Sequence, residues 1–228
     1  MLSSENFYDK LSTSYANASE QRTNYLRSVD RLTDSFISRT KRAKLLDLGS
    51  GDGVRIQKLL LGSPIEISAV ENSPEMCKLL YKNTAIAQVY EFDIVGLEVP
   101  QSSFNYVTAL WNVFGHVVDI DIALKKAFES LTTGGIFIFD VNNPLNVRAY
   151  GIYPAFKNLL FLLIWRRDRK IKLKKNGNET WVYFRSAWYY RKVLKEIGFR
   201  NIRVFFIDYV SGKNANKFTG QIFIVCSK

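Results

Sequence analysis

The sequence predicts an α/β fold: a doubly wound, mostly parallel seven-stranded sheet with helices on both faces and a C-terminal antiparallel hairpin strand. Three observations support this fold class. Short apolar runs alternate with segments of helical periodicity over the first 143 residues. The runs are apolar almost throughout, as expected for strands that are buried on both faces. The chain ends on two further strand-like segments around a polar stretch, which is typical of a hairpin.

Seven segments predict strands because they are short, rich in branched and aromatic residues, and bounded by polar residues or glycine. They are residues 44–48, 65–70, 87–92, 106–111, 136–141, 202–209 and 218–226. Helical segments follow the first, second and fourth of these strands, and a loop joins the third to the fourth. This near-regular alternation predicts that the first five strands are parallel, with right-handed connections. The last two flank the stretch SGKNANK and predict an antiparallel pair.

Apolar spacing and end-forming residues predict the helices. These are residues 5–39, 54–61, 74–83, 122–131 and 187–197. Ser73 offers an N-cap for the third of them, and Pro74 follows at its first helical position. We expect the pair Gly134-Gly135 to end the fourth helix and Gly198 to end the fifth.

The chain has the size and apolar content of a single domain. Its 228 residues are 47% hydrophobic, which is ample for one core and short for two. We expect one domain over residues 1–228. It divides into an N-terminal helical part at 1–40, a core at 41–143, an irregular insert at 144–185 and a final helix and hairpin at 186–228.

Cysteine usage and the absence of long apolar runs bear on location. Cys77 and Cys226 are far apart and lack metal-ligand spacing, which fits a reducing compartment. The polar N-terminus has no apolar signal core. The longest apolar run, LLFLLIW at 159–165, is shorter than the ~18 residues of a membrane span. We therefore expect a cytoplasmic protein, with peripheral contact to a membrane left open.

The positive charge is concentrated in the C-terminal part. The net charge is +11, but residues 1–143 hold 14 Lys and Arg against 17 Asp and Glu. Residues 144–228 hold 18 basic residues against 4 acidic ones. This part of the chain therefore suits an anionic partner or surface.

The stretch LLDLGSGDG at 45–53 places three glycines where a strand ends. A strand, a glycine turn and a helix form a cradle for a nucleotide-like ligand. The spacing G-x-G-x-G of Gly49, Gly51 and Gly53 differs from the dinucleotide fingerprint G-x-G-x-x-G. Asp47 and Asp52 would repel a pyrophosphate and suit a ligand with a positive centre.

Five segments in order resemble the class I S-adenosylmethionine-dependent methyltransferases of the small single-domain type. LLDLGSGDG looks like the first motif of that family, AVENSPEM like the second, and EFDIV like the acidic loop after strand three. ALWNVFGHVVDIDIALKKAFESLTTGG resembles the segment from strand four to the double glycine before strand five. YYRKVLKEIGF and the hairpin match the end of the family's fold, so the resemblance covers nearly the whole chain.

The resemblance implies S-adenosyl-L-methionine as cofactor and assigns its contacts. These are Tyr15, Asp47, Gly49, Ser50, Gly51, Gly53, Glu71, Asn72, Met76, Asp93, Ile94, Leu110 and Trp111. Asp47 would lie near the ammonium group, Glu71 would accept hydrogen bonds from both ribose hydroxyls, and Asp93 with the Ile94 backbone would meet the adenine amino group. Met76 also fits a core position by its helical spacing. Tyr8 and Tyr15 lie seven residues apart in a segment that resembles an N-terminal lid, where they would cover the site or simply pack.

Methyl transfer from a sulfonium is an in-line displacement that requires positioning and, for some acceptors, a base. His116 is the single histidine of the chain and is the candidate base; the alternative is that it braces its loop. Tyr8, Asn112, His116 and Asn142 are the expected substrate contacts. Asn112, Asp140 and Asn142 share one edge of the sheet, and each could also cap a loop.

The insert offers three interpretations. It joins the apolar run to seven basic residues: Arg166, Arg167, Arg169, Lys170, Lys172, Lys174 and Lys175. It could be a lid over a small-molecule pocket, a membrane-interface segment or a nucleic-acid surface. We expect methylation of an oxygen or nitrogen of a small molecule, a class that includes lipid-like acceptors and natural-product intermediates. An RNA methyltransferase is the alternative, although the sequence has no RNA-binding module and no Asn/Asp-Pro-Pro-Tyr tetrapeptide. A non-catalytic cofactor-binding subunit is a further alternative, which turnover would exclude.

Overall fold

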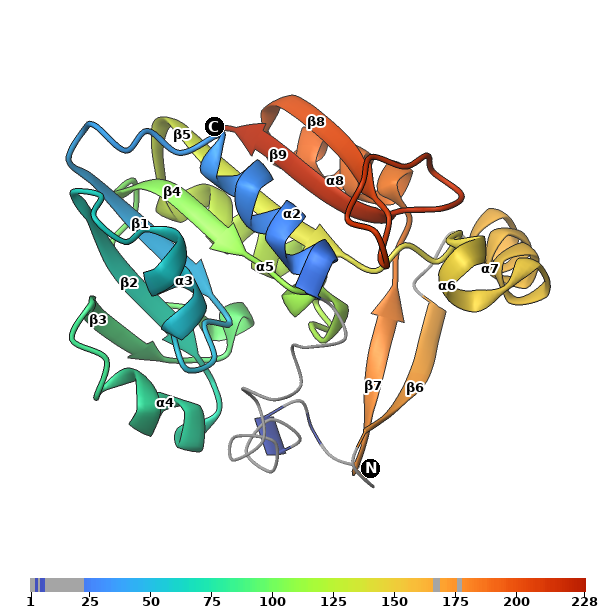
Figure 1. The fold of residues 1–228 in the computed structure, drawn as a ribbon, viewed down its shortest axis with the longest axis horizontal. Helices are drawn as coiled ribbons and strands as arrows, with labels where there is room; N and C mark the ends of the chain where they lie inside the picture. The colour runs from blue at the N-terminus through green and yellow to red at the C-terminus, as the bar shows by residue number, and fades with distance from the viewer. Residues whose placement is uncertain (1–2, 4, 7–22, 166–168, 176–177) are drawn as a thin grey trace.

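The computed structural model describes residues 3, 5–6, 23–165, 169–175 and 178–228 and confirms the predicted architecture (Figure 1). The main sheet contains β1 (Ala43–Leu48), β2 (Ile65–Glu71), β3 (Ile86–Glu91), β4 (Phe104–Ala109), β5 (Leu131–Val141), β8 (Arg200–Ile207) and β9 (Gln221–Ser227). Its strand order is β3-β2-β1-β4-β5-β9-β8. The first five strands run parallel to one another, and β9 lies antiparallel between β5 and β8.

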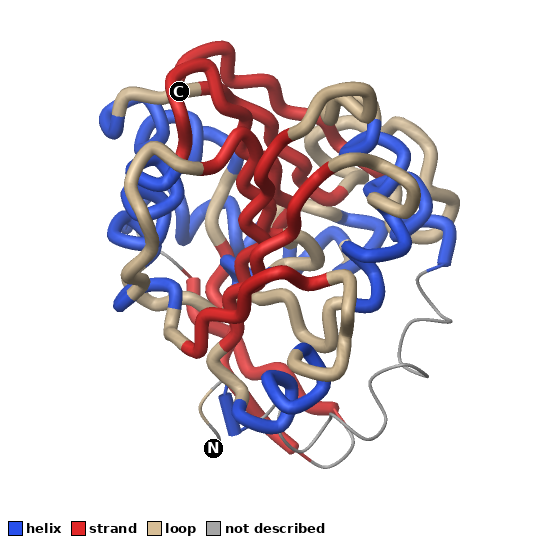
Figure 2. The backbone as a smooth tube through the Cα atoms, turned by 90° about the vertical axis from the view of Figure 1, so that its left-hand side faces the viewer, coloured by secondary structure: helices blue, strands red, loops and turns tan. Residues whose placement is uncertain are grey.

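Helices cover both faces of this sheet (Figure 2). On one face, α2 (Thr23–Asp34) and α3 (Val54–Leu59) bury Val29 and Ile56 in one apolar cluster. On the other face, α5 (Ile120–Ser130) and α8 (Ala187–Ile197) bury Leu124 and Leu194 in a second cluster. Consecutive strand residues alternate between the two clusters because side chains of a strand point to opposite faces in turn.

The expected helix ends are largely confirmed. Ser73 caps α4 (Pro74–Leu80), and its hydroxyl accepts a hydrogen bond from the Met76 N–H at 3.3 Å. Gly198 ends α8 with φ +115°, a backbone region that glycine adopts without strain. The predicted helix at 5–39 is found as α2 in its second half, and its residues 7–22 lie outside the described part of the chain.

The predicted role of the pair Gly134-Gly135 is wrong. Helix α5 ends at Ser130, and the glycines lie inside β5 instead. The Gly134 N–H donates to the Lys228 carbonyl, and the Lys228 N–H donates to the Gly135 carbonyl, both at 3.0 Å. A Cβ at Gly135 would lie 2.9 Å from the Thr132 carbonyl oxygen. The positive φ of +76° therefore explains Gly134, and the lack of space for a Cβ explains Gly135.

The prediction that residues 144–185 lack regular structure is also wrong. This insert contains α6 (Val147–Tyr150), α7 (Ile152–Trp165), β6 (Arg169–Lys175) and β7 (Asn178–Phe184). The last two form a separate antiparallel hairpin that projects from the main sheet (Figure 1). In the register of this hairpin Lys170 lies opposite Tyr183, and Ile171 lies opposite Val182. Polar and apolar residues alternate from Lys170 to Lys174, so Lys170 and Lys172 share one face of the hairpin with Tyr183 and Trp181, and Ile171 shares the other with Val182.

The order of the strands positions a ligand site. Strand β1 lies inside the sheet, between β2 and β4. The strand order therefore reverses at β1, because β2 and β3 extend the sheet on one side and β4 and β5 extend it on the other. In open α/β sheets, ligands bind at the carboxyl ends of the strands where the strand order reverses. The loops after β1, β2 and β4 therefore meet at the expected position of a site.

Candidate active site

Three glycines shape the loop after β1. Gly49, Gly51 and Gly53 have φ values of +67°, +58° and +71°, in the left-handed region. A Cβ at Gly49 would lie 2.8 Å from the Val113 side chain, and a Cβ at Gly53 would lie 2.7 Å from Leu80. Gly49 and Gly51 line a cavity, whereas Gly53 begins α3 and lies outside the cavity lining. Backbone conformation and packing against neighbouring side chains therefore account for Gly53.

The carboxylate of Glu71 fastens this loop to the end of β2. It accepts hydrogen bonds from the backbone N–H groups of Gly51 at 2.9 Å, Asn72 at 3.0 Å and Ser73 at 2.9 Å. Glu71 is 7% exposed and also lines the cavity. Glu71 therefore stabilises the glycine loop, a structural role that was not predicted from the sequence.

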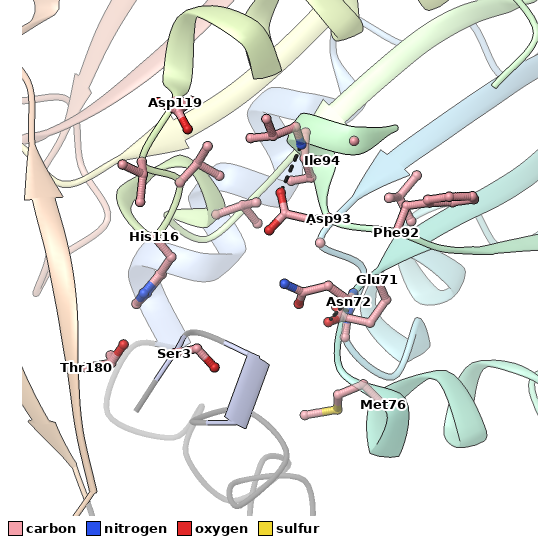
Figure 3. Close-up of a pocket in the computed structure, with 18 of the residues that line it drawn as sticks. Ser3, Glu71, Asn72, Met76, Phe92, Asp93, Ile94, His116, Asp119 and Thr180 are labelled. Atoms are coloured by element: carbon pink, nitrogen blue, oxygen red, sulfur yellow. Dashed lines mark hydrogen bonds between the residues drawn. The ribbon is translucent and has the colours of Figure 1, made fainter. Parts of the chain in front are cut away.

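The cavity has a volume of about 630 Å³ and lies at the predicted edge of the sheet (Figure 3). The predicted site residues that line it are Gly49, Gly51, Glu71, Asn72, Met76, Asp93, Ile94, Leu110, Trp111 and His116. Those that lie outside the lining are Asp47, Ser50, Gly53, Asn112 and Asn142. Tyr8 and Tyr15 fall outside the described residues.

The charges around the cavity are negative. Glu71, Asp93 and Asp119 contribute carboxylates, and none of the described residues that line the cavity is Lys or Arg. Such a lining suits a ligand that carries positive charge and disfavours a phosphate-rich one.

Asp47 and Ser50 lie beneath the glycine loop. The Thr108 hydroxyl donates to Asp47 Oδ1 at 2.6 Å, and the Ser50 hydroxyl donates to the Asp47 carbonyl at 2.8 Å. Burial raises the pKa of Asp47 to about 6, against the lowering effect of the hydrogen bond from Thr108. Asp47 therefore supports the loop from below and does not face the cavity directly.

The loop after β4 has an unusual backbone. Trp111 and Asn112 have φ values of +67° and +66°, which side-chain-bearing residues rarely adopt. Asp140 at the end of β5 accepts a hydrogen bond from the Trp111 N–H, and Asn112 Oδ1 accepts one from the Asn142 N–H at 2.8 Å. This hydrogen bond holds the loop in its conformation, so Asn112 and Asn142 support the site from outside the cavity lining.

Asp93 and Met76 each have a structural role and also border the cavity. The Asp93 side chain caps a short 3₁₀ helix (Ile94–Gly96) by accepting the Val95 N–H at 2.9 Å, and it still borders the cavity (Figure 3). Met76 is fully buried and also forms part of the cavity lining.

The wall opposite Glu71 was only partly predicted. His116 follows a 3₁₀ helix (Val113–Gly115) and lies across the cavity from Glu71 and Met76 (Figure 3). Thr180, Trp181 and Tyr183 of β7 complete this side. Other lining residues that sequence reasoning missed are Ser3, Val70, Phe92, Val95, Gly96, Val113, Val117, Val118 and Asp119. The alternation of TWVYF signals a strand, but nothing local indicates that this strand reaches the cavity.

Comparisons with known proteins agree with the site. The family model described as a methyltransferase domain matches residues 18–204, and no protein of curated function matches the sequence. A methyltransferase of Haloferax volcanii, solved with the Trm112 activator, is 14% identical with a TM-score of 0.69, over 99% of this chain and 97% of that one. A S-adenosylmethionine-dependent methyltransferase of Thermotoga maritima is 16% identical with a TM-score of 0.68, over 98% and 99%.

A third structure contains the cofactor. Phosphoethanolamine N-methyltransferase 2 of Haemonchus contortus, in complex with S-adenosyl-L-methionine, is 13% identical with a TM-score of 0.61; the match covers 89% of this chain and 52% of that one. These low identities show a common fold, and the family model spans most of the chain. The chain therefore belongs to the class I S-adenosylmethionine-dependent methyltransferases, enzymes whose cofactor is S-adenosylmethionine.

Proposed function

We propose that this methyltransferase acts on an oxygen or nitrogen of a small molecule. One observation carries the proposal: the glycine loop and strand β7 line the same cavity of about 630 Å³. This volume lies in the range of small-ligand pockets, roughly 300 to 1,000 Å³. A cofactor at the glycine loop leaves the β7 side for the acceptor, so both reactants would share one cavity.

The residues around the glycine loop fit the cofactor. When bound, S-adenosylmethionine supplies a methyl group on a positively charged sulfur. The negative lining described above suits that charge, and Gly49 and Gly51 let a ligand approach the backbone. We assign Asn72, Met76 and Ile94 to the adenine side, and Leu110 and Trp111 to the methionine side, as the family resemblance implies.

Glu71 is assigned to the ribose of the cofactor, which it would bind while also holding the glycine loop. Its two oxygens already accept three backbone N–H groups, and a carboxylate offers about four acceptor positions. A ribose hydroxyl that binds Glu71 therefore shares the carboxylate with the loop. Asp47 acts on the ammonium group indirectly, through the loop that it supports.

His116 is assigned as the base that removes a proton from the acceptor. Its side chain faces the cavity on the β7 side, where the acceptor would lie. A neutral imidazole accepts a proton near neutral pH. Thr180, Trp181 and Tyr183 would position the acceptor, because they line the same cavity as His116.

RNA is the second candidate acceptor, and the hairpin is the observation that favours it. The Lys170 ammonium lies 4.4 Å from the centre of the Trp181 ring, and aromatic rings beside cations form stacking platforms for bases. The acidic cavity lining speaks against an RNA backbone at the reactive end.

The experiment that decides the acceptor is methyl transfer from labelled S-adenosylmethionine into an extract of the source cells. The extract is then separated into small soluble molecules, lipids, RNA and protein, with heat-inactivated enzyme as the control. Label in small molecules or lipids supports the proposal, and label in RNA selects the alternative. Absence of label in every fraction would contradict both and favour a non-catalytic subunit.

A further inference from the structure

Helix α7 presents a broad apolar face to the solvent. Ile152, Tyr153 and Ile164 are 79%, 75% and 69% exposed. Phe156, Leu160 and Leu163 are also exposed and lie on the same side of the helix, at spacings close to one helical turn. These six residues are here called the α7 face. Single exposed apolar residues are ordinary, but a contiguous patch of large side chains marks an interaction surface.

The opposite side of α7 is anchored, so the exposed face is held in place. Ala155, Asn158 and Leu162 are buried, at spacings of three and four residues. The Asn158 amide donates a hydrogen bond to the Pro144 carbonyl at 2.7 Å. The helix therefore buries one side against the protein and cannot turn the α7 face inward without losing these contacts.

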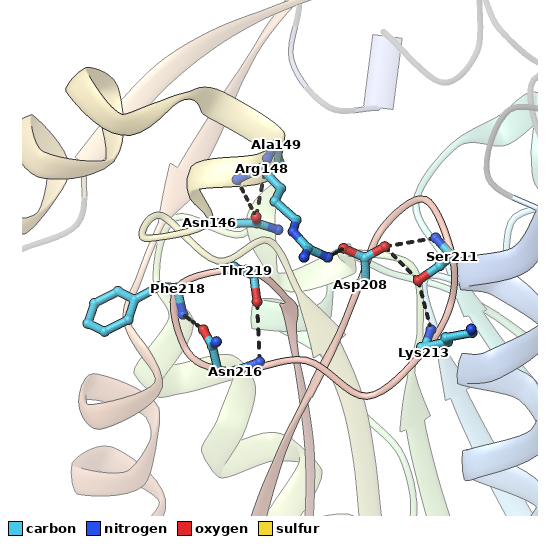
Figure 4. A network of polar contacts seen from close by, with 9 residues as sticks. All are labelled: Asn146, Arg148, Ala149, Asp208, Ser211, Lys213, Asn216, Phe218 and Thr219. Carbon is cyan, nitrogen blue, oxygen red and sulfur yellow. Dashed lines mark hydrogen bonds and ion pairs between the residues drawn. The ribbon is translucent and has the colours of Figure 1, made fainter.

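A second set of contacts ties the insert to the loop between β8 and β9 (Figure 4). The Arg148 guanidinium binds Asp208 at 2.9 Å, and the Val147 N–H donates to the Phe218 carbonyl at 2.8 Å. Phe218 is itself 45% exposed, and the Lys217 ammonium lies 5.0 Å from the centre of its ring. A further exposed aromatic side chain with a cation beside it thus borders α6.

The charge of residues 144–175 indicates which kind of partner fits the α7 face. From residue 144 to 175 the sequence has nine basic residues and a single acidic one, Asp168. Helix α7 has one charged residue, the exposed Lys157. A second copy of the chain would bring a like-charged region against this one, which costs free energy. An anionic lipid surface attracts both features, because basic residues are attracted to its negative charge and apolar side chains enter the boundary between head groups and acyl chains.

We propose that the α7 face is a docking surface for an anionic lipid membrane. The helix has 14 residues, too few to span a bilayer, and no described helix is long and apolar enough to do so. It would lie in the plane of the interface, with the exposed Lys157 toward the lipid head groups. This inference does not depend on the identity of the methyl acceptor.

The test is co-sedimentation of the full-length protein with vesicles, without cofactor. Vesicles of phosphatidylcholine containing phosphatidylglycerol are compared with vesicles of phosphatidylcholine alone. The variant F156Q/L163Q removes two exposed apolar side chains and no buried one. The matched control L61Q/Y81S changes two residues that are 73% and 63% exposed and that follow α3 and α4, outside the insert. Circular dichroism establishes that both variants fold.

We expect the wild type and the control to bind the anionic vesicles, with weaker binding at high salt. F156Q/L163Q should bind about tenfold more weakly, because less apolar area enters the lipid. Failure of the wild type to bind anionic vesicles, or equal binding by F156Q/L163Q, would overturn the proposal. So would light scattering that shows a wild-type dimer and a monomeric F156Q/L163Q, since the face would then be an interface between copies. Cofactor affinity, measured separately, tests the methyltransferase site and not this surface.

Discussion

The Tyr25 hydroxyl of α2 donates a hydrogen bond to Asp140 Oδ2 at 2.6 Å, which links this helix to the loop that follows β4. Asp140 is 2% exposed, and its other oxygen accepts the Trp111 N–H. The Arg55 guanidinium lies 4.2 Å from the centre of the Trp111 ring and makes a two-pronged ion pair with Asp30 of α2. Helices α2 and α3 therefore hold Trp111, a residue of the cavity wall, in its left-handed conformation.

Two buried carboxyls make stability depend on pH. Burial raises the pKa of Asp47 and of Asp140 to about 6 from an ordinary 3.8. A carboxyl that holds its proton more tightly when folded contributes stability below pH 3.8, and this contribution is lost as the pH rises through 6. The loss amounts to about 3 kcal/mol for each carboxyl. The free energy of unfolding, from urea titrations between pH 4 and 7, should fall with rising pH from this cause.

Asp47→Asn should flatten this fall, because an amide does not titrate and its oxygen still accepts the Thr108 hydroxyl. Thr108→Val should have the opposite effect, since it removes a hydrogen bond that lowers the pKa of Asp47. A wild-type slope in Asp47→Asn would show that this carboxyl does not titrate in the window.

Glu71 should be required for cofactor binding. Glu71→Ala removes a ribose acceptor and leaves the N–H groups of Gly51, Asn72 and Ser73 without their carboxylate. We expect the affinity for S-adenosylmethionine, measured by calorimetry, to fall more than about tenfold, which corresponds to 1.4 kcal/mol or more. Glu75→Ala, in the exposed first turn of α4, is the matched control and should bind normally. An unchanged titration for Glu71→Ala would remove this residue from the site.

His116 should affect turnover and not cofactor affinity. His116→Gln removes the titrating imidazole, and loss of a general base lowers the rate by roughly a hundredfold or more. The rate of the wild type should rise with pH as the imidazole loses its proton and can act as a base, and the variant should lack this rise. Ile122→Ser, in the helix that follows this loop, is 47% exposed and outside the cavity lining, and it is the control for a disturbance of this segment. If the rise with pH survives in His116→Gln, the histidine is a bracing residue.

The sequence predicted what local patterns encode. The apolar runs, the Ser73 cap and the glycine loop depend on neighbouring residues, and the structure has them where they were expected. The hydrogen bonds that hold the loops of the site were not predictable from neighbouring residues. Asn112 meets the backbone of Asn142, 30 residues away, only because β4 and β5 are paired in the sheet.

The insert shows a second limit of sequence reasoning. Polar and apolar residues alternate in β6, where Lys170 and Lys172 point to one face and Ile171 to the other. The many basic residues around them made this strand pattern hard to recognise in the sequence. The glycine pair after α5 looked like a helix end because glycine commonly ends helices. Its actual partner, Lys228, is remote in sequence. The single-domain organisation and the ligand contacts of the site residues remain predictions.

Trp181 should determine how well the acceptor binds. It lines the cavity from β7, opposite the glycine loop, and the Lys170 ammonium beside its ring helps to orient it. Trp181→Ala should raise the KM for the acceptor found in the labelled extract by about tenfold, because a large apolar wall is lost. Cofactor affinity should stay unchanged, and Trp181→Phe should restore most of the acceptor binding. Trp188→Ala is the matched control, since Trp188 is 46% exposed on α8 and lies outside the cavity lining. An unchanged KM in Trp181→Ala would place the acceptor away from the hairpin, and a loss of cofactor affinity instead would assign this wall to the cofactor.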